Sequence, residues 1–362
     1  YNEKAKTFTL HTQNTTYQMQ IDAYGFLLHL YYGRKTDGVM DYLLTYADRG
    51  FSGNPQDAGN DRTYSLDVLP QEFPCRLTGD FRSPVLDLVN ADGSFGCDLR
   101  YQGYEICNGK YNLEGLPAVY AAEEEAQTLI IYMKDQVTGL QVELLYGVLP
   151  EYDVITRSAK VINTEEDKIR LTKAQAACID LLHGEFDVIS FYGRHAMERN
   201  MQRTPVGHGA FVIGSRRGTS SHQYNPMMIL AEKETTEDAG TCYGMSFVYS
   251  GGFKAEVEKD QFGQTRMQMG LQEEQFSYPL KKGEEFVIPE VILTCSNQGL
   301  GKLSQNLQRC IRKNLCRGKY KEKVRPVLIN SWEACYFDFT GEDIYHLAEQ
   351  AKDLGIDMVV LD

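Results

Sequence analysis

The feature of this sequence that most constrains its fold is a period-two alternation of apolar and polar residues, which extends from the N-terminus to about residue 295. In the stretch LQVELLY, Leu140, Val142 and Leu144 share one face of a strand, and the polar residues between them share the other. The runs DVITRSAKVIN, FKAEVEKD and EEFVIPEVILTC are further strand candidates, with clusters of Gly, Asn, Asp and Pro between the runs. Because many strands follow one another without intervening helices, the chain is predicted to be mainly β, with one large antiparallel sandwich.

The period changes after Asn297. Apolar residues from Leu300 to Leu315 then recur at helical spacing, and Gly318 is a plausible end of the helix. The run KYKEKVRP that follows is basic, and we interpret it as a solvated connector rather than an anion site.

The last stretch alternates strand and helix. PVLIN is predicted to be a buried strand and SWEACYFDF the loop after it, while Thr340 and Asp343 approximate a capping box at the start of a helix. Gly355 ends that helix and IDMVVL forms a second strand, so a right-handed crossover makes the two strands parallel. Two strands do not make a stable sheet, so this βαβ unit is predicted to begin a larger domain. The predicted domains are 1–298, a linker helix and connector at 299–325, and the beginning of this larger domain at 326–362.

Composition excludes several classes of protein. A net charge of −13 argues against nucleic acid as a partner, and no stretch approaches the length of a membrane span. The nine cysteines include no CxxC pair, which favours free thiols in a reducing cytoplasm, and no signal peptide is visible. The spacing of His183, His195, His208 and His222 matches no ligand pattern, so neither a metal site nor a cofactor is expected.

Several motifs resemble glycoside hydrolase family 36. The runs VLINSWEACYFDF and AKDLGIDMVVLD are similar to the opening of the catalytic barrel in the α-galactosidases of that family, and RTYSLDVLPQEFP, SRRGTSSHQYNP and YGMSFVYSGGF are similar to its N-terminal β-supersandwich. The resemblance implies a mainly β chain: a large antiparallel β-supersandwich, a linker helix and the first βαβ of a (β/α)8 barrel that is incomplete in this chain.

The same resemblance implies four substrate-binding residues, two of them at barrel-strand ends. Trp332, the one tryptophan, matches an aromatic residue of the sugar site, where a ring covers the apolar face of a pyranose. Asp362 matches a carboxylate that binds sugar hydroxyls at the end of the second barrel strand. Without the resemblance, Trp332 is better interpreted as a packing residue. For Asp362 the alternative is a polar residue that ends a strand, and we favour the binding role. We interpret the neighbouring Glu333 as structural.

The other two residues lie in the β region. Asp48 is in the loop YADRGFSGNP, which matches a family loop that reaches the sugar pocket of a neighbouring subunit, although its composition alone is that of an ordinary surface loop. Tyr192, in FYGRHAMER, matches an aromatic residue that lines the substrate site and is tryptophan in other family members. Its phenol ring keeps a face on which a sugar can stack.

The resemblance implies a retaining exo-acting α-galactosidase that hydrolyses terminal α-D-galactosyl residues of oligosaccharides such as melibiose and raffinose. It also implies a homo-oligomer, with a tetramer expected. Retaining hydrolysis needs a nucleophile and an acid/base carboxyl group, and in the family both follow on later barrel strands. No catalytic residue is therefore assigned here, and the 362-residue chain alone is predicted to be inactive. The alternative is a non-catalytic carbohydrate-binding or oligomerisation β domain.

Overall fold

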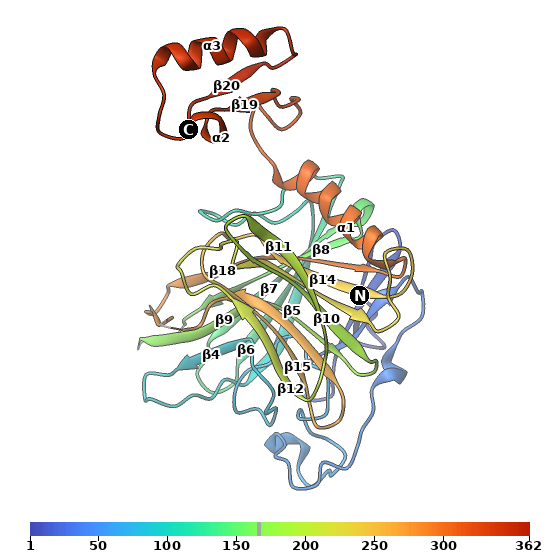
Figure 1. The fold of residues 1–362 in the computed structure, drawn as a ribbon. Helices are drawn as coiled ribbons and strands as arrows, with labels where there is room; N and C mark the ends of the chain where they lie inside the picture. The colour runs from blue at the N-terminus through green and yellow to red at the C-terminus, as the bar shows by residue number, and fades with distance from the viewer. Residues whose placement is uncertain (165–167, 275) are drawn as a thin grey trace. The chain divides into compact units, whose positions relative to one another are not determined.

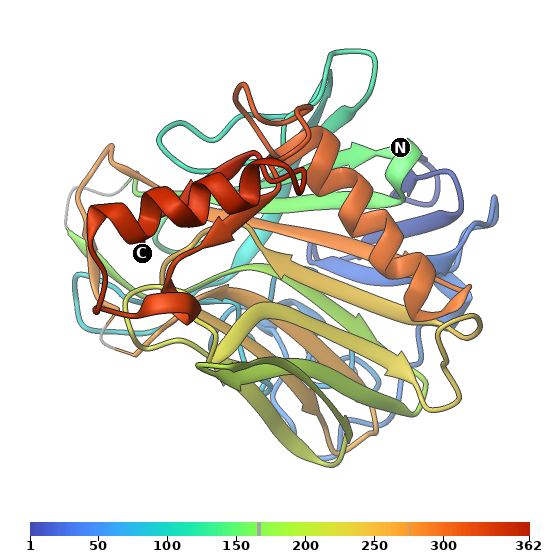
Figure 2. The same cartoon turned by 45° about the horizontal axis from the view of Figure 1, so that its top comes forward.

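The computed structural model describes residues 1–164, 168–274 and 276–362. These residues form two compact units, Tyr1–Leu315 and Cys316–Asp362 (Figures 1 and 2). The fold is mainly β, as predicted, and the strands of the first unit pair antiparallel. The domain boundaries expected after residues 298 and 325 stay predictions for the complete protein.

The largest element of the first unit is a nine-stranded antiparallel sheet. Its strands, in spatial order, are β11 (Met197–Pro205), β10 (Phe186–Arg194), β13 (Tyr224–Glu232), β14 (Cys242–Phe247), β18 (Glu285–Ser296), β8 (Val154–Ile162), β7 (Gln141–Leu149), β6 (Gln127–Asp135) and β5 (Leu99–Asn108). The strands expected in LQVELLY, DVITRSAKVIN and EEFVIPEVILTC correspond to β7, β8 and β18, so these three predictions are confirmed.

Two smaller antiparallel sheets complete the strand layers of this unit. The six-stranded sheet contains β12 (Gly209–Gly214), β15 (Phe253–Lys259), β16 (Thr265–Leu271), β9 (Ile169–Leu181) and β17 (Tyr278–Leu280), with β4 (Leu86–Val89) also paired to β9. The three-stranded sheet contains β1 (Thr7–His11), β2 (Thr15–Ile21) and β3 (Leu27–Arg34). The predicted strand in FKAEVEKD is β15.

One continuous hydrophobic core joins the three sheets. It contains Phe8, Tyr17 and Tyr32 from the three-stranded sheet, Val161 from the nine-stranded sheet and Met269 from the six-stranded sheet. Each of these side chains is at most 2% exposed. The alternation read from the sequence therefore marks faces that are covered by another sheet, as expected for packed β layers.

A helix covers the other face of the nine-stranded sheet (Figure 1). Helix α1 (Gly299–Cys310) continues into a π-helical turn, η4 (Ile311–Leu315), and together they carry the predicted helical periodicity. Gly299 begins the helix at φ +78°, and a Cβ there would lie 2.4 Å from the Glu237 carbonyl oxygen, so glycine is required for this close approach. Single-turn 3₁₀ helices are η1 (Asp41–Leu43), η2 (Gln56–Ala58) and η3 (Pro150–Tyr152).

A buried ionic network, which the sequence analysis did not identify, ties the sheets together. Glu72, in the loop before β4, accepts hydrogen bonds from Tyr17 Oη of β2 at 2.7 Å and from Tyr146 Oη of β7 at 2.9 Å. Arg157 of β8 also donates to it, and His29 Nδ1 of β3 lies 3.0 Å away. Burial raises the pKa of Glu72, but the positive charge of Arg157 and the hydrogen bonds outweigh this effect, so the pKa is lowered. A charged carboxylate therefore joins the three-stranded to the nine-stranded sheet.

A second network of this kind fixes the same loop to the six-stranded sheet. Asp180 of β9 accepts from Arg266 Nε at 2.7 Å and from the backbone amide of Gln71 at 2.8 Å. Arg266 also donates to Asp80 at 2.7 Å. Burial opposes the charge of Asp180, yet Arg266 and Arg82 lower its pKa to about 2. Charged hydrogen bonds thus attach the loop around residues 65–85 both to the three- and nine-stranded sheets and to the six-stranded sheet.

The C-terminal unit is the predicted βαβ arrangement. Strands β19 (Leu328–Asn330) and β20 (Met358–Val360) pair in parallel, and helix α3 (Gly341–Lys352) connects them. Thr340 caps α3: Asp343 donates its amide to Thr340 Oγ1, and the Asp343 carboxylate accepts from the Thr340 amide at 2.7 Å, so the expected capping box is present. The segment predicted as a loop after β19 differs from the prediction because it begins with one helical turn, α2 (Trp332–Cys335).

Candidate functional site

The C-terminal unit places two of the predicted site residues at the same edge of its strand pair. Asn330 ends β19 and pairs with Val360, which ends β20, and Trp332 and Asp362 each follow two positions later. Asn330 Nδ2 donates to Asp362 Oδ2 at 2.9 Å, and Asn330 Oδ1 accepts from the Trp332 amide at 2.7 Å. Carboxyl ends of parallel barrel strands are where active sites lie, so this edge is the candidate site.

Perpendicular aromatic contacts fix the indole ring of Trp332. Its centroid lies 5.3 Å from that of Tyr336 and 4.9 Å from that of Phe337, with interplanar angles of 86° and 88°. Tyr336 ends the helical turn with a positive φ of +50°. Glu333 accepts a hydrogen bond from Tyr336 Oη at 3.2 Å within the same turn.

A ring beside a carboxylate suits a polyhydroxylated ligand. The half-buried indole of Trp332 offers an apolar surface, and the exposed carboxylate of Asp362 can accept hydrogen bonds from hydroxyl groups. Ser331, which is buried, accepts a hydrogen bond from the Asp362 amide at 3.3 Å and so positions the end of the second strand. Asn330 and Ser331 were not predicted as site residues. The sequence feature that could have indicated them is their position just before Trp332, at the end of a strand.

Asp48 lies in an exposed loop of the β unit and is held by a two-pronged ion pair. Arg62 donates from Nη2 to Asp48 Oδ1 at 2.8 Å and from Nε to Oδ2 at 3.2 Å, and the Gly50 amide donates at 2.8 Å. The hydrogen bonds from Arg62 lower the pKa of Asp48. The carboxylate is therefore charged, and its side chain is 64% exposed. Arg62, which orients this carboxylate, was not predicted as a site residue.

Tyr192 lies where the β10–β11 hairpin departs from regular pairing. The register of β10 shifts on both sides of Tyr192, which pairs with Asn200 of β11 and with Tyr224 of β13. The next residue, Gly193, approaches the opposite strand so closely that a Cβ would lie 2.4 Å from the Met197 carbonyl oxygen. Such irregularities re-aim a side chain, and the Tyr192 side chain is 43% exposed.

The structure thus brings Trp332 and Asp362 together through Asn330, whereas Asp48 and Tyr192 belong to the other unit. The substrate-binding roles of all four stay predictions. Within residues 1–164, 168–274 and 276–362, no group of His, Cys, Asp and Glu side chains is gathered to hold a metal ion. None of the helices in these described segments is long and apolar enough to cross a membrane.

Comparison with family models assigns most of the chain. Residues 25–281 match the model described as the glycosyl hydrolase family 36 N-terminal domain, and residues 285–362 match the model described as melibiase. The sequence is 63% identical over 362 residues to the bifunctional alpha-galactosidase/sucrose kinase AgaSK of Mediterraneibacter gnavus, covering 100% of this chain and 39% of that protein. It is 41% identical over 364 residues to alpha-galactosidase Mel36A of Lactobacillus acidophilus, covering 50% of that protein.

Solved structures show the same fold. The galactosidase domain of AgaSK superposes with a TM-score of 0.96 at 63% identity, over 99% of this chain and 50% of that one. A variant of alpha-galactosidase AgaA from Geobacillus stearothermophilus, solved in complex with raffinose, gives a TM-score of 0.95 at 42% identity, again over 99% and 50% of the two chains. The chain therefore spans half or less of the length of these relatives.

Proposed function

Because the chain belongs to glycosyl hydrolase family 36, we propose that it is the N-terminal part of an α-galactosidase that removes terminal α-D-galactosyl residues from oligosaccharides such as melibiose and raffinose. The observation that carries the proposal is the Trp332–Asn330–Asp362 arrangement at the edge of the parallel strand pair. It combines one aromatic face with one hydroxyl-binding carboxylate, which is the chemistry that a pyranose ring requires.

In this proposal the residues of this chain bind and orient the sugar. Trp332 covers the apolar face of the galactosyl ring, and Asp362 accepts hydrogen bonds from its hydroxyl groups. A carboxylate that is matched to particular hydroxyl groups discriminates between epimers, since the wrong epimer leaves it unpaired. The nucleophile and the acid/base carboxyl group of a retaining mechanism stand about 5–5.5 Å apart. We assign neither role to a residue of this chain.

The β unit contributes the remaining binding residues in the proposed enzyme. The charged, exposed carboxylate of Asp48 is oriented by Arg62 so that it can reach a sugar bound to a neighbouring subunit, and Tyr192 supplies a second aromatic surface. This arrangement requires a homo-oligomer, which we propose to be a tetramer located in the cytoplasm. The alternative, a carbohydrate-binding or oligomerisation domain without catalysis, predicts sugar binding but no hydrolysis by the complete protein.

The substitution Trp332→Ala in the complete enzyme tests the proposal. Loss of the stacking surface should lower kcat/KM for an aryl α-galactoside by about tenfold or more, because an aromatic contact is worth on the order of 1 kcal/mol and the indole also excludes water. Steady-state kinetics and a melting curve measure the effect. The control is Tyr345→Ala, which removes an exposed aromatic side chain (57%) from α3, outside the Trp332–Asn330–Asp362 arrangement.

The expected result is a large loss of kcat/KM for Trp332→Ala with a melting temperature close to that of the control. An unchanged kcat/KM together with a lowered melting temperature would instead make Trp332 a packing residue. Sugar binding without turnover in the unmodified complete protein would favour the alternative function.

A further inference from the structure

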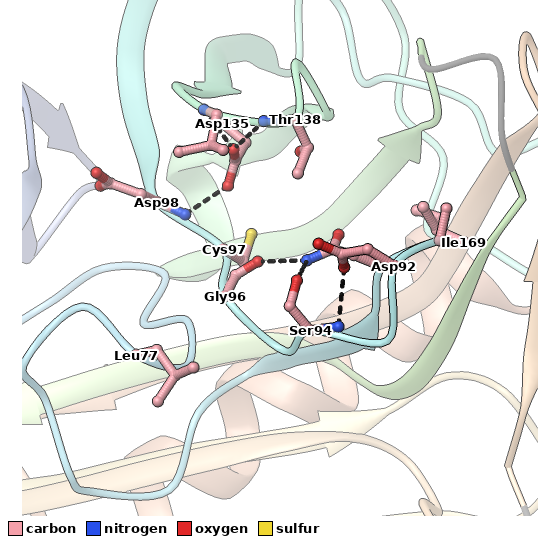
Figure 3. Close-up of a pocket in the computed structure, with 12 residues that line it drawn as sticks. Leu77, Asp92, Ser94, Gly96, Cys97, Asp98, Asp135, Thr138 and Ile169 are labelled. Atoms are coloured by element: carbon pink, nitrogen blue, oxygen red, sulfur yellow. Dashed lines mark hydrogen bonds between the residues drawn. The ribbon is translucent and has the colours of Figure 1, made fainter.

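Two adjoining hollows lie on the β unit, and none of the four predicted site residues lines them. The smaller, drawn in Figure 3, has a volume of about 670 Å³ and the larger of about 940 Å³, and both are lined by Leu77 and Asp98. Because they share these two residues, the two hollows adjoin at Leu77 and Asp98, and together they are named the groove. Each half exceeds the volume of one sugar ring, so the groove has room for more than one ring.

Leu77 has a backbone conformation that packing alone does not explain. Its φ is +66°, in the left-handed region that a branched side chain rarely adopts, and the residue is 68% exposed. The loop that contains Leu77 is restrained by its neighbours. Thr78 Oγ1 donates a hydrogen bond to the Cys75 carbonyl at 3.2 Å. Gly79 packs closely against the backbone of Gly53, since a Cβ on Gly79 would lie 3.1 Å from the Gly53 carbonyl oxygen. Strain that holds an apolar side chain in solvent is characteristic of ligand-binding loops.

The charges of the groove disfavour an anionic ligand. Arg100 is the one basic residue among the described residues that line the two hollows. Its guanidinium is already neutralised, with contacts of 2.6 and 2.9 Å to the Asp98 carboxylate and 3.1 Å to that of Asp57. In the smaller hollow the Asp135 carboxylate accepts from backbone amides, including that of Thr138 at 2.7 Å (Figure 3). No positive charge is left for a phosphate or a carboxylate.

The remaining lining combines amide groups with aromatic surfaces. Asn54, Gln56, Gln102 and Gln136 line the larger hollow and supply both donors and acceptors to hydroxyl groups. Phe81 lines the same hollow with 73% of its surface exposed. A ring of this exposure beside planar amides suits the alternating apolar faces and hydroxyl edges of a sugar.

We propose that this groove is a second, non-catalytic carbohydrate-binding site that takes a neutral oligosaccharide with sugar rings on both sides of Leu77. The proposal rests on the proposed function only for the kind of sugar. The site itself is argued from the lining residues. In an enzyme of the proposed kind, a binding site on the same chain would keep the substrate attached to the enzyme and raise its local concentration.

The experiment measures binding of raffinose, a neutral trisaccharide, to the 362-residue chain by calorimetry and saturation-transfer NMR. The unmodified chain should bind raffinose with a dissociation constant about tenfold below that for galactose, since a single ring fills only one half of the groove. Phe81→Ala should raise the dissociation constant for raffinose by about tenfold, and Leu77→Gly should also raise it without lowering the melting temperature. The matched control is Phe262→Ala, a 46% exposed ring in the turn between β15 and β16 that does not line the groove.

Trp332→Ala separates this site from the candidate active site. Raffinose binding should persist in Trp332→Ala and be lost in Phe81→Ala. The reverse result, or no binding of raffinose at about 50 mM, would overturn the groove proposal. Neither outcome depends on hydrolysis, so a complete enzyme that fails to hydrolyse galactosides would refute the proposed function and leave the groove measurement standing.

Discussion

The two units of the chain carry the same kinds of local sequence pattern, but they bury very different shares of their side chains. In Tyr1–Leu315, apolar strand faces and even charged groups such as Glu72 and Arg157 are completely buried. The small unit, Cys316–Asp362, has two buried residues, Ser331 and Ala351. Apolar residues of the small unit stay exposed, among them Leu328 at 52% and Leu354 at 76%.

A clear local sequence pattern is therefore not enough for a stable unit, because the apolar faces that it creates must also be buried. The small unit has a complete capping box, a periodic helix and a parallel strand pair, as clear as any element of the β unit. Parallel strands nevertheless need covering on both faces, and two of them with one helix cannot provide it. The stability of the β unit comes from layers that cover one another, and the small unit has no second layer.

The largest effect expected from this comparison concerns activity. A protein consisting of these 362 residues should hydrolyse an aryl α-galactoside about 10⁴-fold or more slower than the complete enzyme, because both catalytic carboxylates are predicted to lie on later barrel strands. The rate is measured beside the complete enzyme, with the mass of the fragment verified. Turnover within about tenfold of the complete enzyme would contradict the assignment of the chemistry to those strands.

The next effect tests burial in the β unit. Arg157→Met leaves Glu72 uncompensated between two sheets and should lower the free energy of unfolding by about 3–5 kcal/mol. The matched control is Arg309→Met, which removes an exposed ion pair with Glu151 and should cost about 0–1 kcal/mol. Urea denaturation measures both. Equal costs for the two substitutions would mean that the buried network does not join the sheets.

A smaller effect is expected from acid. The folded-state pKa of Asp180 is about 2, below its ordinary value of 3.8, so the folded chain binds fewer protons than the unfolded chain between these values. The resulting stability is fully present above pH 4 and is lost as the pH falls through 2, at roughly 2 kcal/mol. Urea midpoints between pH 6 and pH 2 measure it. Asp180→Asn should flatten this dependence, and an unchanged slope in that variant would reject the assignment to Asp180.

The smallest effect belongs to the C-terminal unit. Thr340→Ala removes the cap of α3 and should destabilise that helix by about 1 kcal/mol, without moving the unfolding transition of the β unit. Hydrogen exchange at the amides of α3 measures the change, with Glu349→Gln on the exposed face of the same helix as the control. A shift of the main transition would show that the two units unfold together.

The candidate site was predictable where it depends on strand ends. Asp362 directly follows the apolar run MVVL and Trp332 lies shortly after the run VLI, so both are expected at one edge once the strands are parallel. Arg62 and Asn330 could not be found in this way, because each acts through a side chain that folding brings to it, Asp48 in one case and Asp362 in the other. The placement of Tyr192 at a break in strand register was equally invisible, since the register is set by partner strands.

Local sequence patterns predicted the kinds of element and their order: strands to about residue 295, then a helix, then βαβ. These depend on periodicity and caps, which are properties of neighbouring residues. The place of β18 between β14 and β8 became visible in the folded chain, as did the role of Glu72, inside the mainly apolar run VLPQEFP, in joining two sheets. Strand order and buried charge pairs depend on partners that are far apart in the chain, and their energies arise only when water is excluded from between them.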